Sequence, residues 1–378
     1  MAPPDETSMN GSDKGTKPPP VPPTNSSPTP FFSMGLNTYR VPLTLHSQNR
    51  QKLVKTLIQN ANVPPHSLVF LEGGPSPTRF DTDHEPIFRQ ESYFNYLFGV
   101  KEPDFAACIH VTDATSALPT TVLFAPKLPP EYATFMGKIK TPDEFKAMYA
   151  VDKVLYTEDI ESYLLDHLST PSTDTDSPTT PQLYLLSGPN SDSGNTSTPP
   201  ILPPSLTPFT TTQTLHHHLA NNRVTKSQSE LHLLRHVTAV TSLAHVHVMR
   251  SISPPMMEYQ LESLFKHYCY YYFGHRNLGY TSICGCGPNA AVLHYGHAGA
   301  ANDGVVDRGS LVLCDMGSEY FGYGSDVTCT YPIGGEFTAV QRGVYEGVLQ
   351  AQVDVMGMMK PGVSWVDCHL VAERAILG

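Results

Sequence analysis

The chain of 378 residues is acidic, with 24 Lys and Arg against 35 Asp and Glu and a formal net charge of -11. Such a surface repels a phosphate backbone, which excludes nucleic acid as an expected partner. No stretch approaches the roughly 20 apolar residues of a membrane span, and no apolar run of signal-peptide length lies near the N-terminus, so a cytoplasmic protein without membrane contact is predicted.

The first 35 residues are predicted to form a disordered, proline-rich tail. Nine of the 35 prolines fall within residues 1–30, together with Ser, Thr, Gly and Asn and almost no large apolar side chains. Such a segment cannot bury enough surface to offset the entropy of ordering it. The run at 18–23 fits a P-x-x-P ligand pattern, although a solvated tail is the simpler interpretation.

Residues 36–225 are predicted to form a first, α/β domain. A helix is expected at 47–60, where Leu53, Val54, Leu57 and Ile58 share one face. Short apolar runs bounded by turn residues predict strands at 67–71, 94–100, 106–111, 121–125 and 183–186. Two low-complexity polar tracts, 169–182 and 189–208, are expected to be long surface loops.

Residues 226–378 are predicted to form a second domain. Ser227 followed by Glu230 is a capping-box pattern in front of a helical apolar stripe. A further helix is expected over 258–273, and strands over 310–316 and 320–331. The seven cysteines are odd in number and scattered, which argues against a disulfide framework.

The most informative residues are two aspartates in the predicted hairpin at 309–332. Asp315 closes an apolar strand and Asp326 lies in the predicted returning strand eleven residues later. Residues that face each other in such a hairpin lie about 4.5–5.5 Å apart at Cα. Two carboxylates in an apolar setting repel strongly unless they share a proton or a cation. A hard divalent cation is the solution that this pattern favours, while a turn-forming role for each Asp remains the simpler alternative.

A third candidate is His294, in the sequence AVLHYGHAG at 291–299. The glycines around it favour a place where backbone approaches a ligand. A satisfied core or surface histidine is the competing interpretation.

Several motifs together resemble the prolidase, or Xaa-Pro dipeptidase, branch of the "pita-bread" metallopeptidases. They include FRQESYFNYLFGV at 88–100, LHYGHAGA followed by ND at 293–303, LCDMGSEYxxYxSDVT at 313–328 and MKPGVSW at 359–365. The resemblance covers roughly residues 36–375 and implies a creatinase or aminopeptidase P-like N-terminal α/β domain. The fold class is then α/β (α+β), with an incomplete pita-bread catalytic domain in the second half.

The resemblance also implies an active site with two metal ions, usually Mn²⁺, held by five side chains. Asp315 and Asp326 match the first two ligands, and His294 matches a histidine that lines the substrate pocket. The expected substrates are Xaa-Pro dipeptides, and the full-length form is expected to be a homodimer. The remaining ligands of the family are one His and two Glu, and one of the two Glu residues is expected to shuttle the proton in catalysis.

No match to those three ligand motifs occurs before Gly378, so a C-terminally truncated chain is expected. His369 and Glu373 could share a helix face but match no ligand motif, and they are interpreted as ordinary helix residues. The chain alone is therefore predicted to be inactive. The alternatives are a non-catalytic dimerising fragment, or an aminopeptidase P that acts on longer Xaa-Pro peptides.

Overall fold

The computed structural model describes residues 30–61, 63–111, 118–169, 180–296 and 302–377. Most of the predicted tail and most of the tract 169–182 lie outside the described residues. By compactness the chain divides into an N-terminal unit, residues 30–235 with Phe321–Tyr323, and a C-terminal unit, His236–Tyr320 with Gly324–Gly378. The predicted boundary at residue 226 lies just ahead of helix α7 (Gln228–Ser251), and the division by compactness falls inside that helix.

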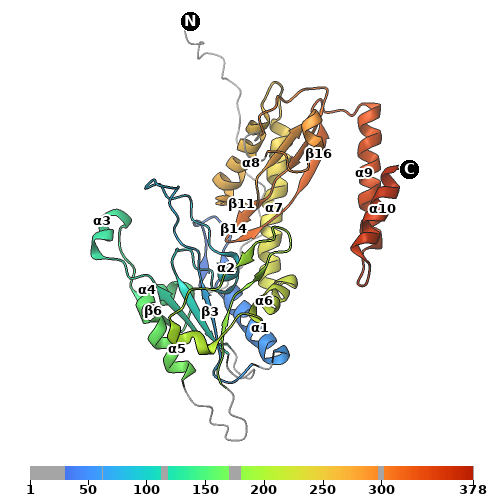
Figure 1. The fold of residues 1–378 in the computed structure, drawn as a ribbon. Coiled ribbons are helices and arrows are strands. Elements are labelled where there is room, and N and C mark those ends of the chain that lie inside the picture. The colour runs from blue at the N-terminus through green and yellow to red at the C-terminus, as the bar shows by residue number, and fades with distance from the viewer. Residues whose placement is uncertain (1–29, 62, 112–117, 170–179, 297–301, 378) are drawn as a thin grey trace. The chain divides into compact units, whose positions relative to one another are not determined.

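The N-terminal unit is built on a mixed six-stranded sheet (Figure 1). Its strand order is β10 (Thr210–Thr211), β7 (Leu183–Leu185), β3 (Leu68–Glu72), β4 (Ala106–His110), β5 (Thr121–Ala125) and β6 (Lys153–Tyr156). Strand β4 pairs antiparallel with both β3 and β5. The remaining pairs, β3 with β7, β7 with β10 and β5 with β6, are parallel. Because nearly every residue of these three strands is buried, both faces of the sheet are covered.

The helices of this unit are short apart from the first. They are α1 (Thr44–Asn60), α2 (Ser92–Phe98), α3 (Ala133–Met136), α4 (Pro142–Tyr149), α5 (Ile160–Leu168) and α6 (Leu215–Val224). Phe70, Phe124 and Leu164 are fully buried in the core between the sheet and α5. The mixed sheet with helices confirms the predicted α/β class.

One predicted strand of this unit is wrong, because residues 94–100 belong to helix α2 and its C-terminal cap. The Glu91 carboxylate accepts hydrogen bonds from the backbone nitrogens of Tyr93 (3.0 Å) and Phe94 (2.7 Å), which caps the helix start. Gly99 ends the helix in the left-handed conformation at φ 64°. A short apolar run cannot distinguish a strand from a buried helix, and here the two caps decide.

Two further segments are more regular than predicted. The end of the expected tail forms β1 (Phe31–Phe32), which pairs antiparallel with β2 (Val41–Pro42). The tract 189–208 contributes to a small hairpin of β8 (Gly188–Pro189) and β9 (Thr196–Ser197), and to a 3₁₀ helix at Pro204–Phe209. Leu206 anchors this tract because its side chain is fully buried in the core of the unit.

The C-terminal unit combines two long helices with a three-stranded antiparallel sheet. Helices α7 and α8 (Glu258–Phe273) pack on one face of the sheet, whose order is β12 (Ile283–Cys286), β13 (Leu311–Asp315) and β16 (Thr328–Pro332). Short strands β11 (Asn277–Leu278) and β14 (Ser318–Tyr320) pair with each other, and β15 (Tyr323–Gly324) follows. The predicted strand 320–331 is therefore interrupted, because Phe321 and Gly322 adopt positive φ and break the extended chain.

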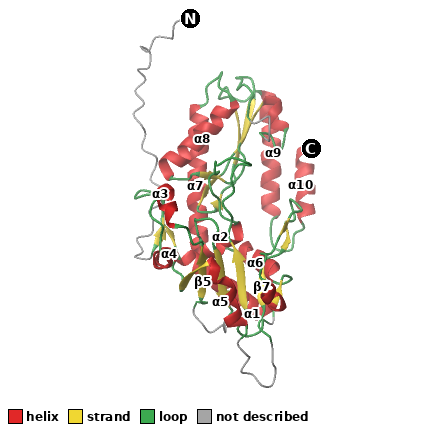
Figure 2. Cartoon of the chain, turned by 60° about the vertical axis from the view of Figure 1, so that its left-hand side comes forward, coloured by secondary structure: helices red, strands yellow, loops and turns green. Residues whose placement is uncertain are grey.

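Helices α9 (Ala339–Met358) and α10 (Trp365–Leu377) form a helical hairpin (Figure 2). Thr338 caps α9 through a capping box with Gln341. The seven cysteines all lie in described residues and are free. Among the described residues, no helix is both long enough and apolar enough to cross a membrane.

Candidate metal centre

Strand β13 places Asp315 on the face of its sheet that is turned away from helices α7 and α8. The alternate residues Val312 and Cys314 are buried in the core that these helices form, together with Met316. Leu311, Leu313 and Asp315 are half-buried and share the opposite face, because successive side chains of a strand point to opposite sides. Asp315 is therefore accessible from the open side of the sheet.

The hairpin pattern predicted that Asp326 lies directly opposite Asp315, but the two residues are not paired in the sheet. The register pairs Asp315 with Thr328, and Asp326 lies in the non-strand segment 325–327 that precedes β16. The two carboxylates nevertheless meet at one atom. The hydroxyl of Tyr280 is hydrogen-bonded to Oδ1 of Asp315 and lies 3.1 Å from Oδ1 of Asp326.

The Tyr280 hydroxyl can satisfy only one of these carboxylates at a time, because a phenol carries a single proton. Burial, followed by the hydrogen bond to Asp315, raises the pKa of Tyr280 far above its usual value, so the group stays neutral. A neutral donor does not cancel the repulsion between the two negative charges. The arrangement is therefore suited to a positive charge close to the Tyr280 hydroxyl.

Gly317 permits the close approach that brings Asp326 to Asp315. A Cβ at this position would lie 1.8 Å from the carbonyl oxygen of Ser325, so no other residue fits without displacing the backbone. Thr241 of α7 fastens the same two segments, since its Oγ1 lies 2.8 Å from Oγ of Ser318 and 2.6 Å from Oγ of Ser325. Ser325, which precedes Asp326, is therefore held in place by helix α7, which lies far from it in the sequence.

The other residues considered from the sequence, His294 and His369, lie in other segments of the chain. His294 is exposed in a turn that follows the 3₁₀ helix Gly287–Ala291, and no hydrogen bond within the described residues joins it to either aspartate. The neighbouring His297 lies outside the described residues. His369 is on α10, where its ring packs edge-on against Trp365, in agreement with its interpretation as an ordinary helix residue.

The donor set suits a hard divalent cation in kind but is small in number. Carboxylate oxygens are the ligands that Mn²⁺ and Mg²⁺ prefer. Within the part of the chain that the structure describes, no group of three or more His, Cys, Asp or Glu side chains is placed to hold a metal. Two carboxylates leave most of the coordination sphere to water or to other ligands. Sequence reasoning had missed Tyr280, since a single tyrosine ahead of a strand carries no recognisable signal.

Two family matches divide the chain in the same way as its architecture. Residues 46–175 match the aminopeptidase P N-terminal domain, and residues 232–377 match metallopeptidase family M24. Among solved structures, proline aminopeptidase P II from Yersinia pestis superposes with a TM-score of 0.68 at 27% identity, covering 88% of this chain and 72% of that one. A variant of Escherichia coli aminopeptidase P gives a TM-score of 0.70 at 25% identity over 89% and 73% of the two chains.

The similar proteins of known class include Xaa-Pro dipeptidases and Xaa-Pro aminopeptidases. The Xaa-Pro dipeptidase of Homo sapiens is 44% identical over 346 residues, which cover 91% of this chain and 67% of that protein. The Xaa-Pro dipeptidase of Pongo abelii matches at the same level. A "Probable Xaa-Pro aminopeptidase pepP" of Talaromyces stipitatus is 30% identical over 91% and 69% of the two chains. The chain therefore belongs to the Xaa-Pro dipeptidase family of M24 metallopeptidases.

Proposed function

We propose that this chain carries part of the active site for metal-dependent hydrolysis of Xaa-Pro dipeptides, with Asp315 and Asp326 as metal ligands. The observation that supports this assignment is the convergence of both carboxylates on the Tyr280 hydroxyl. Membership of a metallopeptidase family supplies the class of reaction. The identity of the metal as Mn²⁺, and a site for two ions, are part of the proposal.

The described residues would have separate roles in metal binding and substrate binding. Asp315 and Asp326 would hold the metal on the open face of the sheet, and Tyr280 would keep their carboxylates oriented by hydrogen bonding. A bound divalent ion supplies Lewis-acid polarisation of the peptide carbonyl and an activated water. His294, which is exposed, would contact the dipeptide. The imide nitrogen before proline has no N–H, so the pocket must accept a ring and not a donor.

We further propose that the polypeptide of residues 1–378 binds the metal weakly and has little peptidase activity by itself. Only two of the five ligands that the resemblance implies are matched in this sequence, and two carboxylates bind a divalent ion loosely. A Kd of about 1 mM would let about 10 mM Mn²⁺ stabilise the fold by only about 1.4 kcal/mol.

The experiment is a thermal and calorimetric titration of the purified chain with Mn²⁺. We expect a small rise in Tm for the wild type and none for Asp326→Asn. Asp354→Asn, an exposed substitution on α9, is the matched control and should respond like the wild type. An identical Mn²⁺ response in all three proteins would reject the metal centre, and rapid hydrolysis of Gly-Pro in excess Mn²⁺ would reject the proposed inactivity.

An aminopeptidase P that trims longer peptides is the second candidate, and the solved structures with the same architecture favour it. The higher identity to dipeptidases favours the first. Comparing the two ligands Gly-Pro and Gly-Pro-Gly in the same thermal assay separates them. Stabilisation by the dipeptide alone supports the first candidate, and stabilisation by the tripeptide alone supports the second.

We also propose a cytoplasmic homodimer, in keeping with the free cysteines. Val340, Val344 and Val348 form an exposed stripe on α9, with 78%, 60% and 55% of each residue accessible, and such a stripe favours self-association. Sedimentation velocity tests this point. A monomer at all concentrations would reject the dimer, and with it the alternative of a non-catalytic dimerising fragment.

A further inference from the structure

Glu258, the first residue of α8, holds a fully buried carboxylate with four hydrogen-bond donors. Its Oε1 accepts from the backbone nitrogen of Cys286 (2.6 Å) and from Nδ2 of Asn289 (3.1 Å). Its Oε2 accepts from the hydroxyl of Tyr295 (2.6 Å) and from the backbone nitrogen of Gly304 (2.9 Å). The acceptor capacity of the carboxylate is therefore filled, which is how a protein makes a buried charge tolerable.

The four donors surround His294 in the sequence. Cys286 and Asn289 precede it, Tyr295 is its immediate neighbour, and Gly304 follows. The backbone nitrogen of Glu258 also donates to the carbonyl of Gly304 at 2.9 Å. A Cβ on Gly304 would lie 2.8 Å from Cδ and Oε2 of Glu258. The backbone at residue 304 therefore packs against the carboxylate with no room for a side chain. One carboxylate thus fastens the chain on both sides of His294.

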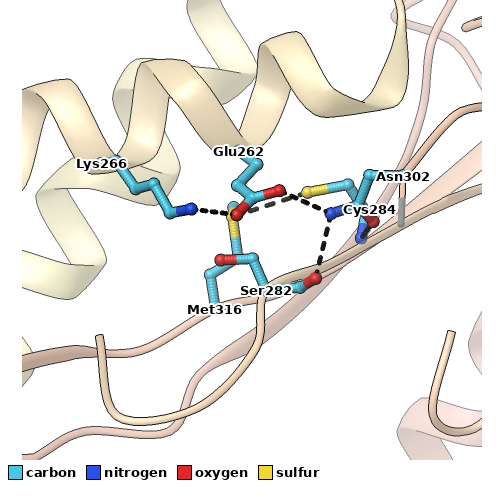
Figure 3. A network of polar contacts seen from close by, with 6 residues as sticks. All are labelled: Glu262, Lys266, Ser282, Cys284, Asn302 and Met316. Carbon is cyan, nitrogen blue, oxygen red and sulfur yellow. Dashed lines mark hydrogen bonds and ion pairs between the residues drawn. The ribbon is translucent and has the colours of Figure 1, made fainter. Parts of the chain in front are cut away.

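A second tie comes from the next turn of the same helix (Figure 3). Nδ2 of Asn302 donates to Oε2 of Glu262 (2.9 Å) and to the carbonyl of Ser282 (3.0 Å), and its Oδ1 accepts from the backbone nitrogen of Cys284 (2.9 Å). Lys266 pairs with Glu262 on the outer side. Asn302 is buried in the left-handed conformation at φ 51°, which asparagine tolerates better than most residues. The segment is therefore held to α8 and to β12 after His294 as well as before it.

We propose that Glu258 is a positioning residue for His294, acting through Tyr295 and Gly304 to fix where the imidazole stands. Glu258 itself is fully buried, and its carboxylate is occupied by four donors of the protein. Tyr295 is buried and the adjacent His294 is exposed, so an anchor on Tyr295 acts directly next to the imidazole. This inference rests on the proposed role of His294 in contacting the dipeptide, but the anchoring can be tested separately.

Three variants of the full 378-residue chain test the anchoring. Tyr295→Phe removes one hydroxyl and leaves the other three donors to Glu258 in place. Glu258→Gln keeps the side-chain shape but turns one acceptor atom into a donor that faces N–H and O–H groups. Tyr271→Phe is the matched control, because its exposed phenol lies on the same helix. Amide hydrogen exchange over 286–304 and the C2–H proton resonance of His294 are measured in each.

We expect exchange at 286–296 and 304 to accelerate about tenfold or more in Glu258→Gln, as loss of charge-assisted hydrogen bonds implies. Tyr295→Phe should give a smaller acceleration with an almost unchanged Tm, and the His294 resonance should move in both variants. The Tyr271→Phe protein should match the wild type. If neither exchange nor the His294 resonance changes in Tyr295→Phe and Glu258→Gln, or if only the global Tm falls, the positioning role is overturned.

A Gly-Pro titration of the same samples keeps the two proposals apart. A dipeptide-induced shift of the His294 resonance in the wild type, weakened in Tyr295→Phe, supports both the pocket and its positioning. Absence of a shift in the wild type rejects the contact between His294 and the dipeptide, while the exchange data still decide whether Glu258 anchors the segment.

Discussion

The six-stranded sheet of the N-terminal unit and the β12–β13–β16 sheet of the C-terminal unit use burial in opposite ways. In the N-terminal unit, strands β3, β4 and β5 are buried along almost their whole length, so both faces are committed to packing. In the C-terminal unit, β13 alternates between buried and half-buried residues, and its half-buried side ends in Asp315. The faces of a sheet that is buried on both sides are committed to packing, whereas a sheet with an open face can present carboxylates on that face to a ligand.

The largest effect should come from truncating the core of the N-terminal sheet. Phe124→Ala removes a fully buried ring that packs edge-on against Phe70 and Tyr163, and we expect it to cost about 3–5 kcal/mol of unfolding free energy. Leu313→Ala, on the half-buried face of β13, should cost roughly 1–2 kcal/mol. Urea unfolding followed by circular dichroism measures both, and equal losses would contradict the difference between the sheets.

Gly317→Ala should be the most damaging change at the carboxylate pair itself. Its methyl group would collide with the carbonyl of Ser325, and forcing the segments apart should cost about 3 kcal/mol. Gly343→Ala is the control, because that helical glycine has open space around it and the substitution should stabilise by up to about 1 kcal/mol. Comparable stability of the two variants would show that the close approach of residues 317 and 325 is not needed.

Acid should weaken both units through buried histidines. Burial lowers the pKa of His46 and His110 in the N-terminal unit to about 4, that of His236 in the C-terminal unit to about 4, and that of His275 there to about 3. The unfolded chain takes up these protons near pH 6.5 and the folded chain does not, so stability is complete above pH 6.5 and falls as the pH drops toward 4. Each of these histidines should account for a loss on the order of 2–3 kcal/mol of unfolding free energy.

The contribution of the C-terminal unit can be isolated with one substitution. Nε2 of His236 and Nε2 of His275 lie 3.2 Å apart. Each neutral imidazole already carries one proton, so a further proton on this pair would place a charge in a buried site. His275→Gln should therefore flatten the pH dependence of stability between pH 6.5 and 4, measured by urea unfolding at several pH values. An unchanged slope would mean that other groups carry the acid sensitivity.

The smallest effect is expected for the exposed partner of the carboxylate pair. Without metal, Asp326→Asn removes one of two like charges near the Tyr280 hydroxyl, so unfolding free energy should stay within about 0.5 kcal/mol of the wild type or rise slightly. A loss of more than about 1 kcal/mol in unfolding free energy would indicate that Asp326 stabilises the fold. It would then weaken the assignment of Asp326 as a metal ligand.

Local patterns predicted much of this architecture. The strand at Thr121–Ala125 and the helix at Glu258–Phe273 agree with the prediction. Burial of one helix face leaves apolar residues at helical spacing, and burial of a whole strand leaves a short apolar run bounded by turn residues. The same reasoning failed at Ser92–Phe98, where a short apolar run fits either structure and the Glu91 cap selects the helix.

By itself, the sequence determined many of the elements, the α/β class and two candidate carboxylates, since each depends on neighbours a few residues apart. Only the tertiary structure decided that Asp315 and Asp326 meet at Tyr280 and that Glu258 holds both sides of His294. Those contacts join residues separated by tens of positions. They depend on the close approach at Gly317 and on the packing of α7 and α8 against the sheet, and no local pattern encodes them.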